Sequence, residues 1–140
     1  MKNEQTMGLG APAVSTSAWA LWGGRALSGL AILFLAMDGI VKLFAPAPVV
    51  ESFVQMGYPA EVAFGLGVVL LVCVAAYAIP RTAVLGAILL TGYLGGAVSA
   101  HVRMGGPVFS LAFPILMGAM VWGGLYLRDR RLRALLPLTS

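Results

Sequence analysis

Charged residues are scarce in this sequence. Only 10% of its 140 residues are Asp, Glu, Lys or Arg, whereas 60% are hydrophobic. A soluble domain carries roughly 25% charged residues, so this chain lacks the polar side chains that would cover a folded surface in water. The composition excludes an ordinary soluble domain and indicates a single domain embedded in a lipid bilayer.

Cysteine and histidine are almost absent as well. Cys73 is the only cysteine and His101 the only histidine. One thiol can form neither an intramolecular disulfide nor a redox dithiol, and a single free cysteine in an apolar run packs as a small hydrophobic residue. No metal site can be assembled from one cysteine and one histidine, and the sequence contains no nucleophile–base–acid set. The sequence therefore assigns no catalytic residue, and the catalytic role is left as unknown.

The net charge of +4 does not indicate a nucleic-acid partner, because the basic residues do not follow one face. Four of them fall within residues 128–133, directly after an apolar run. Basic clusters in that position are typical of the cytoplasmic flank of a membrane span. The lipid bilayer is therefore the expected partner, and nucleic acid is not.

Long apolar runs divide the chain into four expected spans, at about residues 19–44, 62–79, 82–100 and 108–127. Each is long enough, as a helix, to cross a bilayer core of ~30 Å. A loop or short interfacial helix is expected after the first span, and a kink in the fourth at Pro114. The predicted organisation is all-α: a polar tail (1–17), a transmembrane four-helix bundle (18–127) and a basic tail (128–140).

The distribution of basic residues predicts that both termini are cytoplasmic. With four spans the termini share one side, and most basic residues lie there: Lys2, Arg25, Arg81, Arg128, Arg130, Arg131 and Arg133. The positive-inside rule assigns that side to the cytoplasm. Five aromatic residues are expected at the same interface, where an amphipathic belt forms: Trp19, Trp22, Tyr77, Trp122 and Tyr126.

Small residues recur at every fourth position of the third span. They form one row and a second, shorter one: Ala83, Ala87, Thr91, Gly95 and Ser99, then Gly92, Gly96 and Ala100. Rows of this kind let helices approach closely inside lipid. We therefore expect the third span to pack closely against another helix, such as the first span or a partner protein.

Asp38 and Lys42 are the charged pair of the first span. They are four residues apart, with the acid first, which is the favourable order for a pair on one helix face. A lone carboxylate at this depth is unfavourable, so Asp38 must be paired, protonated or next to a polar cavity. Three interpretations remain open: an intrahelical pair with Lys42 extending to the interface, a ligand pocket that opens outward, or a protonated Asp38 that serves only in a hydrogen bond between helices.

His101 and Arg103 follow the third span at the same outer side. If the first and third spans pack together, these two residues converge with Asp38 and Lys42 on one ligand-binding site. His101 is then either an interfacial polar residue or a donor to a quinone-like carbonyl, since its near-neutral pKa range suits proton exchange. Haem is a weaker alternative, because a second axial histidine is missing.

Several motifs together resemble the DoxX-like membrane proteins. The similarity covers about residues 22–137, and its motifs are Arg25, residues 39–43 (Gly-Ile-Val-Lys-Leu), 56–59 (Met-Gly-Tyr-Pro), 85–98, His101, Arg103 and 122–129. The resemblance implies a four-helix protein of a bacterial-type inner (plasma) membrane. It also implies an association with thiosulfate:quinone or quinol oxidoreductases, with oxidative-stress complexes or with membrane-protein assembly.

These observations predict a redox-associated membrane subunit. It would bind a quinone-like or other lipid-soluble molecule near the outer face, at Asp38, Lys42, His101 and Arg103. Its partner would be another membrane or redox subunit, or a second copy of the chain. Two alternatives stay open: a non-enzymatic assembly or interaction protein, and a small transporter that acts as a dimer.

Overall fold

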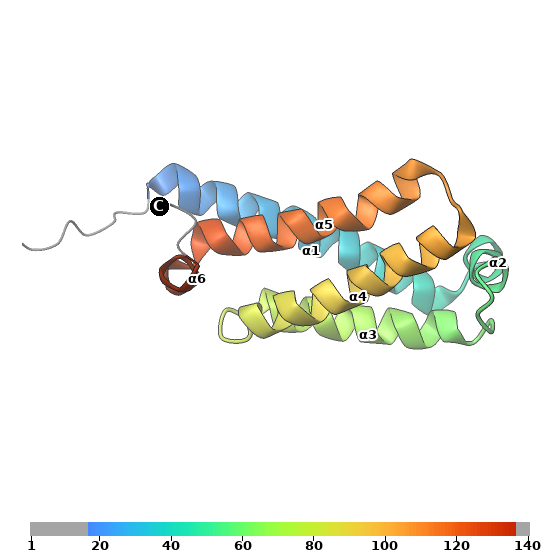
Figure 1. Ribbon diagram of the computed structural model, residues 1–140. Coiled ribbons are helices and arrows are strands. Elements are labelled where there is room, and N and C mark those ends of the chain that lie inside the picture. Colours follow the sequence, from blue (N-terminus) through green and yellow to red (C-terminus); the bar gives the residue numbers. More distant parts are fainter. Residues whose placement is uncertain (1–16, 137–140) are drawn as a thin grey trace, which may run out of the picture.

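The computed structural model describes residues 17–136, which form six α-helices and their connections (Figure 1). The helices are α1 (Ala18–Phe44), α2 (Ala47–Gln55), α3 (Val62–Ala78), α4 (Ala83–Met104), α5 (Val108–Arg128) and α6 (Arg130–Leu135). No strand occurs within residues 17–136, which confirms the all-helical fold. The predicted polar N-terminal tail, apart from residue 17, and residues 137–140 of the basic tail lie outside the described residues.

The long helices form a bundle in which each packs against two others. α1 packs against α3 and α5, and α4 packs against the same two helices, so that α1 and α4 lie diagonally across the bundle. α2 lies across one end of the bundle and α6 lies beside the end of α5 (Figure 1). Direct packing of the first and third spans was the condition for grouping the candidate site residues, and it is not met, because α3 and α5 separate α1 from α4.

Glycines bring α1 close to each of its two neighbours. A Cβ added to Gly24 would lie 2.9 Å from the carbonyl oxygen of Gly124 on α5. A Cβ added to Gly67 on α3 would likewise lie 2.9 Å from the carbonyl oxygen of Gly39. Such approaches exclude any side chain, so these glycines set the positions where backbones meet.

The small-residue row of α4 packs only at its beginning. Ala83 and Ala87 are buried in the core, and a Cβ on Gly86 would lie 2.2 Å from the backbone nitrogen of Tyr77. A Cβ on Gly95 would meet nothing within 4 Å. The later part of the row is therefore not used for packing inside this chain.

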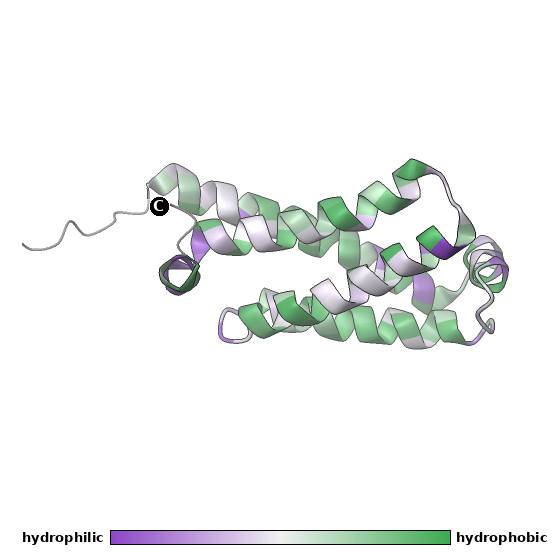
Figure 2. Ribbon diagram, in the orientation of Figure 1, coloured by the Kyte–Doolittle hydropathy of each residue, from purple (hydrophilic) through white to green (hydrophobic). Residues whose placement is uncertain are grey.

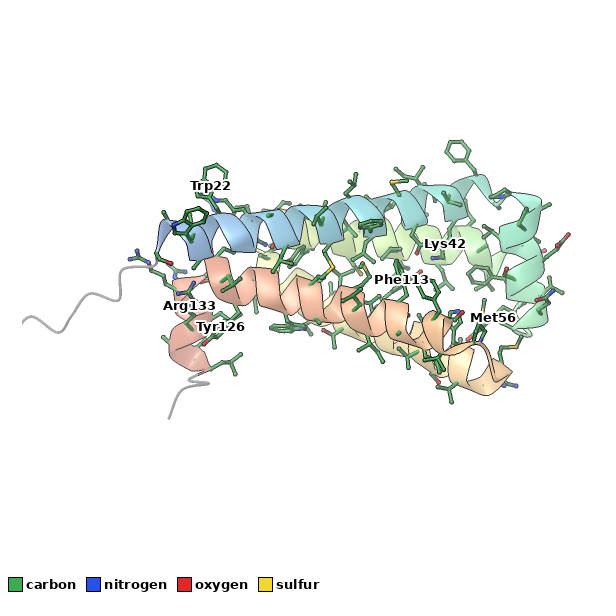
Figure 3. All side chains as sticks on the ribbon, turned by 90° about the horizontal axis from the view of Figure 1, so that it is seen from above. Trp22, Lys42, Met56, Phe113, Tyr126 and Arg133 are labelled. Atoms are coloured by element: carbon green, nitrogen blue, oxygen red, sulfur yellow. The ribbon has the colours of Figure 1, made fainter. Side chains whose placement is uncertain are left out.

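A buried tyrosine joins three helices in the half of the bundle that contains the start of α1 and the end of α5. The Tyr77 hydroxyl of α3 donates to the carbonyl of Val121 on α5 at 2.7 Å, and the Ser28 hydroxyl of α1 lies 2.9 Å from it. Tyr77 is fully buried, so its expected place in an interfacial aromatic belt was wrong. Trp19 and Trp22 are exposed in the first turns of α1, and Figure 3 shows Trp22 at that end.

The outside of the bundle is apolar. α1, α4 and α5 are long and apolar enough to cross a membrane, and α3 is an apolar helix of 17 residues. Large hydrophobic side chains such as Val72, Ile115 and Leu116 are more than half exposed, and the long helices are mostly green to white in Figure 2, with purple mainly toward their ends. Helices that are hydrophobic all round require lipid as their surroundings.

Helix ends determine which residues reach the two ends of the bundle. α4 continues beyond the charge-free run to Met104 and is capped by Gly105, whose φ of +63° is the left-handed value typical of a glycine after a helix. His101 and Arg103 therefore belong to its last turn. Part of the basic tail forms α6, where the Arg133 guanidinium donates to the carbonyls of Tyr126 and Leu127 at the end of α5.

Candidate functional site

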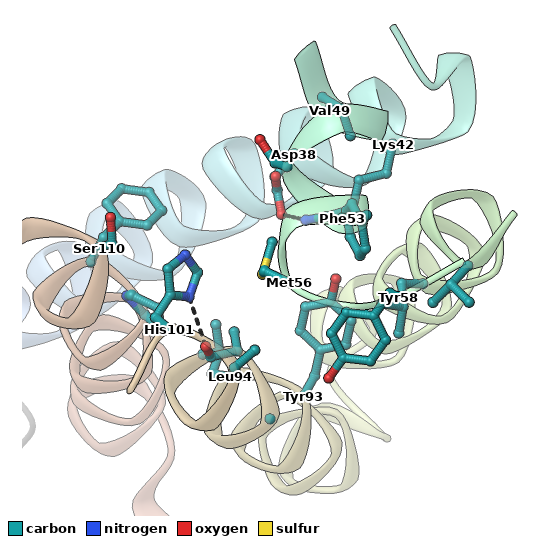
Figure 4. Close-up of a pocket in the computed structure, with 18 of the residues that line it drawn as sticks. Asp38, Lys42, Val49, Phe53, Met56, Tyr58, Tyr93, Leu94, His101 and Ser110 are labelled. Atoms are coloured by element: carbon teal, nitrogen blue, oxygen red, sulfur yellow. Dashed lines mark hydrogen bonds and ion pairs between the residues drawn. The ribbon is translucent and has the colours of Figure 1, made fainter. Parts of the chain in front are cut away.

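A cavity of about 660 Å³ lies in the half of the bundle next to α2 (Figure 4). Its walls come from the C-terminal part of α1, the following α2 segment, the start of α3, the second half of α4 and the start of α5. Most of the lining side chains are apolar. Volume and lining both fall in the range of small-molecule sites, which are ~300–1,000 Å³ and mostly hydrophobic with a few polar groups.

Asp38 and Lys42 of α1 form an ion pair on the cavity wall. The Lys42 ammonium also lies 5.8 Å from the centroid of the Tyr93 ring on α4, a cation–π distance. The Lys42 side chain is only 14% exposed, whereas that of Asp38 is 47% exposed. The two side chains therefore pair along one face of α1, and both also line the cavity. The Asp38 carboxylate is the more accessible of the two groups.

His101 lines the same cavity from α4, on the side opposite α1. Its Nδ1 lies 2.7 Å from the carbonyl oxygen of Ala97, one turn earlier. A carbonyl oxygen can only accept a hydrogen bond, so Nδ1 carries the proton. In the neutral ring Nε2 is then an acceptor, and Figure 4 shows this second nitrogen directed away from the Ala97 carbonyl.

Arg103 is not among the residues that line the cavity. It is exposed in the last turn of α4, two residues beyond His101. The structure thus brings together Asp38, Lys42 and His101, which the sequence grouped as candidates, and leaves Arg103 outside the cavity.

The segment around α2 covers the end of the cavity. Phe53 is buried, and its ring packs edge-on against Tyr58 with the centroids 6.2 Å apart. Met56 projects into the space between α1 and α4 (Figure 4). Either a loop or a short helix was expected here, and α2 is the helix, with Pro46 before its first turn.

One backbone hydrogen bond is missing in the part of α5 that forms a wall of the cavity. The helix continues through Pro114, and both Ser110 and Pro114 line the cavity. Proline has no backbone N–H, so the carbonyl of Ser110 lacks its regular partner four residues later. Carbonyls freed in this way are tolerated in membrane helices where they face a cavity.

Sequence reasoning missed Tyr93, the α2 aromatic residues and Ser110. For Tyr93 a signal existed: it precedes Ala97 and His101 at intervals of four, which places all three on one face of α4. For Phe53 and Ser110 no comparable signal exists, because only the folded chain brings α2 and the start of α5 over this face.

α1 and α5 diverge toward the cavity. They lie side by side near Gly24 and Gly124 and separate toward the α2 end in both views (Figures 1 and 3). Lys42, Met56 and Phe113 are at the wide end, and Trp22 and Arg133 at the narrow end (Figure 3). Asp38 and Phe113 line the cavity from the two diverging helices.

An apolar helical bundle with an internal, partly polar cavity is the structure of a multi-pass membrane protein. The model of the DoxX-like family matches residues 26–124, and the chain belongs to that family, as its motifs indicated. Neither curated proteins nor solved structures gave a match. Within residues 17–136 no group of three or more His, Cys, Asp and Glu side chains is arranged to hold a metal ion.

Proposed function

We propose that this protein binds a lipid-soluble, quinone-like molecule in the cavity, as a subunit associated with redox proteins of the same membrane. The observation that carries the proposal is the cavity itself. It is large enough for a substituted ring, mostly apolar, and bordered by the Asp38–Lys42 pair and by His101. Apolar walls with a few convergent polar groups are typical of ligand sites.

The divergence of α1 and α5 supports entry of the ligand from the lipid. A quinone carries a long apolar tail, and that tail would stay in the bilayer while the ring occupies the cavity. Asp38 and Phe113 line the cavity on the two diverging helices, so a ring moving inward from the lipid would meet them early. An aromatic ring also suits the side chains already there, because Phe53, Tyr93 and Phe113 offer ring contacts.

We further propose four spans, with both termini on the cytoplasmic side of a bacterial-type inner membrane. α3 has 17 residues, a length of about 26 Å at 1.5 Å per residue, which is at the lower limit for crossing the ~30 Å core. Most of the described basic residues lie toward the end of the bundle opposite the cavity, and the positive-inside rule therefore favours this orientation. These residues are Arg25, Arg81, Arg128, Arg130, Arg131 and Arg133. The cavity then opens at the outer side.

A reporter that is active only in the periplasm tests this orientation. Fused to the C-terminus it should give no signal, and reporter activity would contradict the orientation.

Binding can be tested with the full-length chain in nanodiscs. We expect solvent extracts of the protein purified from its membrane to contain quinone, and added decylubiquinone to bind saturably. The decisive variant is Ala97→Phe, because Ala97 lines the cavity between Tyr93 and His101. A phenyl group there would occupy the ligand's space and weaken binding at least about tenfold.

Gly95→Phe is the matched control for this variant. It adds the same side chain on the same helix, at a position where a Cβ meets nothing within 4 Å and which does not line the cavity. Binding by Gly95→Phe should equal that of the native chain. No quinone in the extract together with no saturable binding would refute the proposal, as would undiminished binding by Ala97→Phe.

A second candidate function is assembly with another membrane protein or with a second copy of the chain. The observation that favours it is the unused part of the small-residue row, where Gly95 and Ser99 are exposed and a Cβ on Gly95 has open space. Such a face permits close approach by another helix. Gly95→Leu should then abolish co-purification of the partner or a dimer seen by native mass spectrometry. A complex that survives Gly95→Leu rules out this face.

A further inference from the structure

We infer that the cavity binds the reduced, hydroxyl-bearing form of its ligand more tightly than the oxidised, carbonyl-bearing form. The inference rests on the proposed function and specifies which state of the ligand the site selects. It follows from the hydrogen-bonding character of the groups on the cavity wall, because a hydroquinone donates hydrogen bonds and a quinone only accepts them.

His101 contributes an acceptor. Its Nδ1–H donates a hydrogen bond to the carbonyl of Ala97, with the two atoms 2.7 Å apart. This bond fixes the tautomer of the neutral ring in which Nε2 is unprotonated. One of the alternatives left open by the sequence was the opposite role, a donor to a ligand carbonyl. The bond to Ala97 changes this expectation, since the nitrogen that remains for the ligand has a lone pair and no proton.

The Asp38–Lys42 pair also offers its acceptor more readily than its donor. Lys42 is largely buried, with its ammonium bound to Asp38 Oδ2 and within cation–π distance of the Tyr93 ring. Asp38 is about half exposed, and its Oδ1 has no bond within the described residues. A ligand that reaches the pair therefore meets a carboxylate oxygen before it meets an ammonium proton.

Ser110 provides a third acceptor through its backbone. Pro114 cannot donate to the Ser110 carbonyl, and both residues line the cavity. The tyrosine and serine hydroxyls of the wall do not alter the balance, because a hydroxyl can either donate or accept. Asp38 Oδ1, His101 Nε2 and the Ser110 carbonyl together make the wall richer in free acceptors than in free donors.

Two of these acceptors lie on opposite sides of the cavity, as the two hydroxyl groups of a hydroquinone require. Asp38 belongs to α1, His101 to α4, and these helices lie diagonally across the bundle with the cavity between them (Figure 4). A hydroquinone has its hydroxyls on opposite edges of the ring. A cationic amine ligand would also donate hydrogen bonds. Because Lys42 already neutralises Asp38, however, the positive charge of that amine would be unpaired in an apolar cavity. A neutral hydroxyl avoids that penalty.

The preference can be measured as a shift in the midpoint potential of the bound ligand. We expect decylubiquinol to bind about tenfold more tightly than decylubiquinone, the effect of one or two additional hydrogen bonds. For a two-electron couple a tenfold preference raises the midpoint potential by about 30 mV. The measurement is an anaerobic redox titration of decylubiquinone with the full-length protein in excess, in nanodiscs, against empty nanodiscs.

Two variants locate the source of the shift. Asp38→Asn replaces a carboxylate oxygen by a donor amide, and Pro114→Ala restores the N–H that occupies the Ser110 carbonyl. Each should reduce the preference about threefold or more. Glu61→Gln is the matched control, since it makes the same carboxylate-to-amide change at an exposed residue of the same end that does not line the cavity. It should leave the preference unchanged.

The outcomes separate this inference from the proposed function. If neither form binds, the proposed function fails. If both forms bind with equal affinity, or the oxidised form binds more tightly, the proposed function stands and the inference is wrong. An upward shift that Asp38→Asn, Pro114→Ala and Glu61→Gln all leave unchanged also overturns it, because the acceptors named here would then not be the cause.

Discussion

Tyr77→Phe should destabilise the protein by about 1–2 kcal/mol. The hydroxyl of Tyr77 is fully buried, donates to the carbonyl of Val121 at 2.7 Å and lies 2.9 Å from the hydroxyl of Ser28. Phenylalanine keeps the ring and removes both bonds, so the change isolates the polar contribution of a residue that joins α1, α3 and α5.

The magnitude follows from what each former partner can do afterwards. The Val121 carbonyl still accepts its helical bond, and the Ser28 hydroxyl can turn back to a carbonyl of its own helix. Neither group is fully orphaned, so the loss stays well below the penalty for an isolated buried polar group. Hydrogen bonds between membrane helices measured in this way average about 0.6 kcal/mol and reach about 1.7.

The assay is a double-mutant cycle of Tyr77→Phe and Ser28→Ala, with free energies of unfolding measured in bicelles by steric trapping. We expect a coupling energy of about 0.6–1.7 kcal/mol. Tyr58→Phe is the control, because Tyr58 is 41% exposed, and its effect should be below about 0.5 kcal/mol. Additive effects of the two core variants would refute the reasoning, since the two hydroxyls would then not stabilise each other.

Three further predictions concern packing, the charged pair and α6. Gly86→Leu should prevent folding, because it lowers the free energy of unfolding by at least about 3 kcal/mol, whereas Gly95→Leu should yield folded protein. Size-exclusion profiles after expression distinguish the two outcomes. Asp38→Ala should lower the free energy of unfolding by about 1–2 kcal/mol, because it leaves the largely buried ammonium of Lys42 unpaired. Lys42→Met leaves the more exposed carboxylate unpaired and should lower it by less than about 1 kcal/mol. Steric trapping can measure both values. Arg133→Ala should speed hydrogen exchange in α6 while global stability changes by less than about 0.5 kcal/mol; equal exchange in both proteins would contradict it.

Most helices could be predicted from the sequence because lipid imposes a simple rule. Uncharged apolar runs of spanning length form helices, since no other open structure satisfies their backbone in a bilayer. The rule identified α1, α3, α4 and α5 with ends within a few residues of those observed. It failed at the end of α4, because His101 and Arg103 are polar but still helical, and the helix ends only at Gly105.

Which helices touch could not be predicted, because small residues occur on every long helix. The row in α4 favoured close packing along its whole length, yet the tight backbone contacts form at Gly24 and Gly39 of α1 and, in α4, at Gly86 near its start. Tyr77 was misplaced for a related reason. An aromatic residue near a helix end suits an interface, and only the positions of Ser28 and the Val121 carbonyl show that its hydroxyl is satisfied in the core.

The cavity follows from where the glycines of α1 lie. Gly24 holds the beginning of α1 against α5, and Gly39 holds its later part against α3. The two positions are 15 residues apart, about 22 Å along the helix, and α1 moves from one neighbour to the other over that length. It therefore leaves α5 before it reaches Asp38, and the space that opens between them is lined by the charged pair.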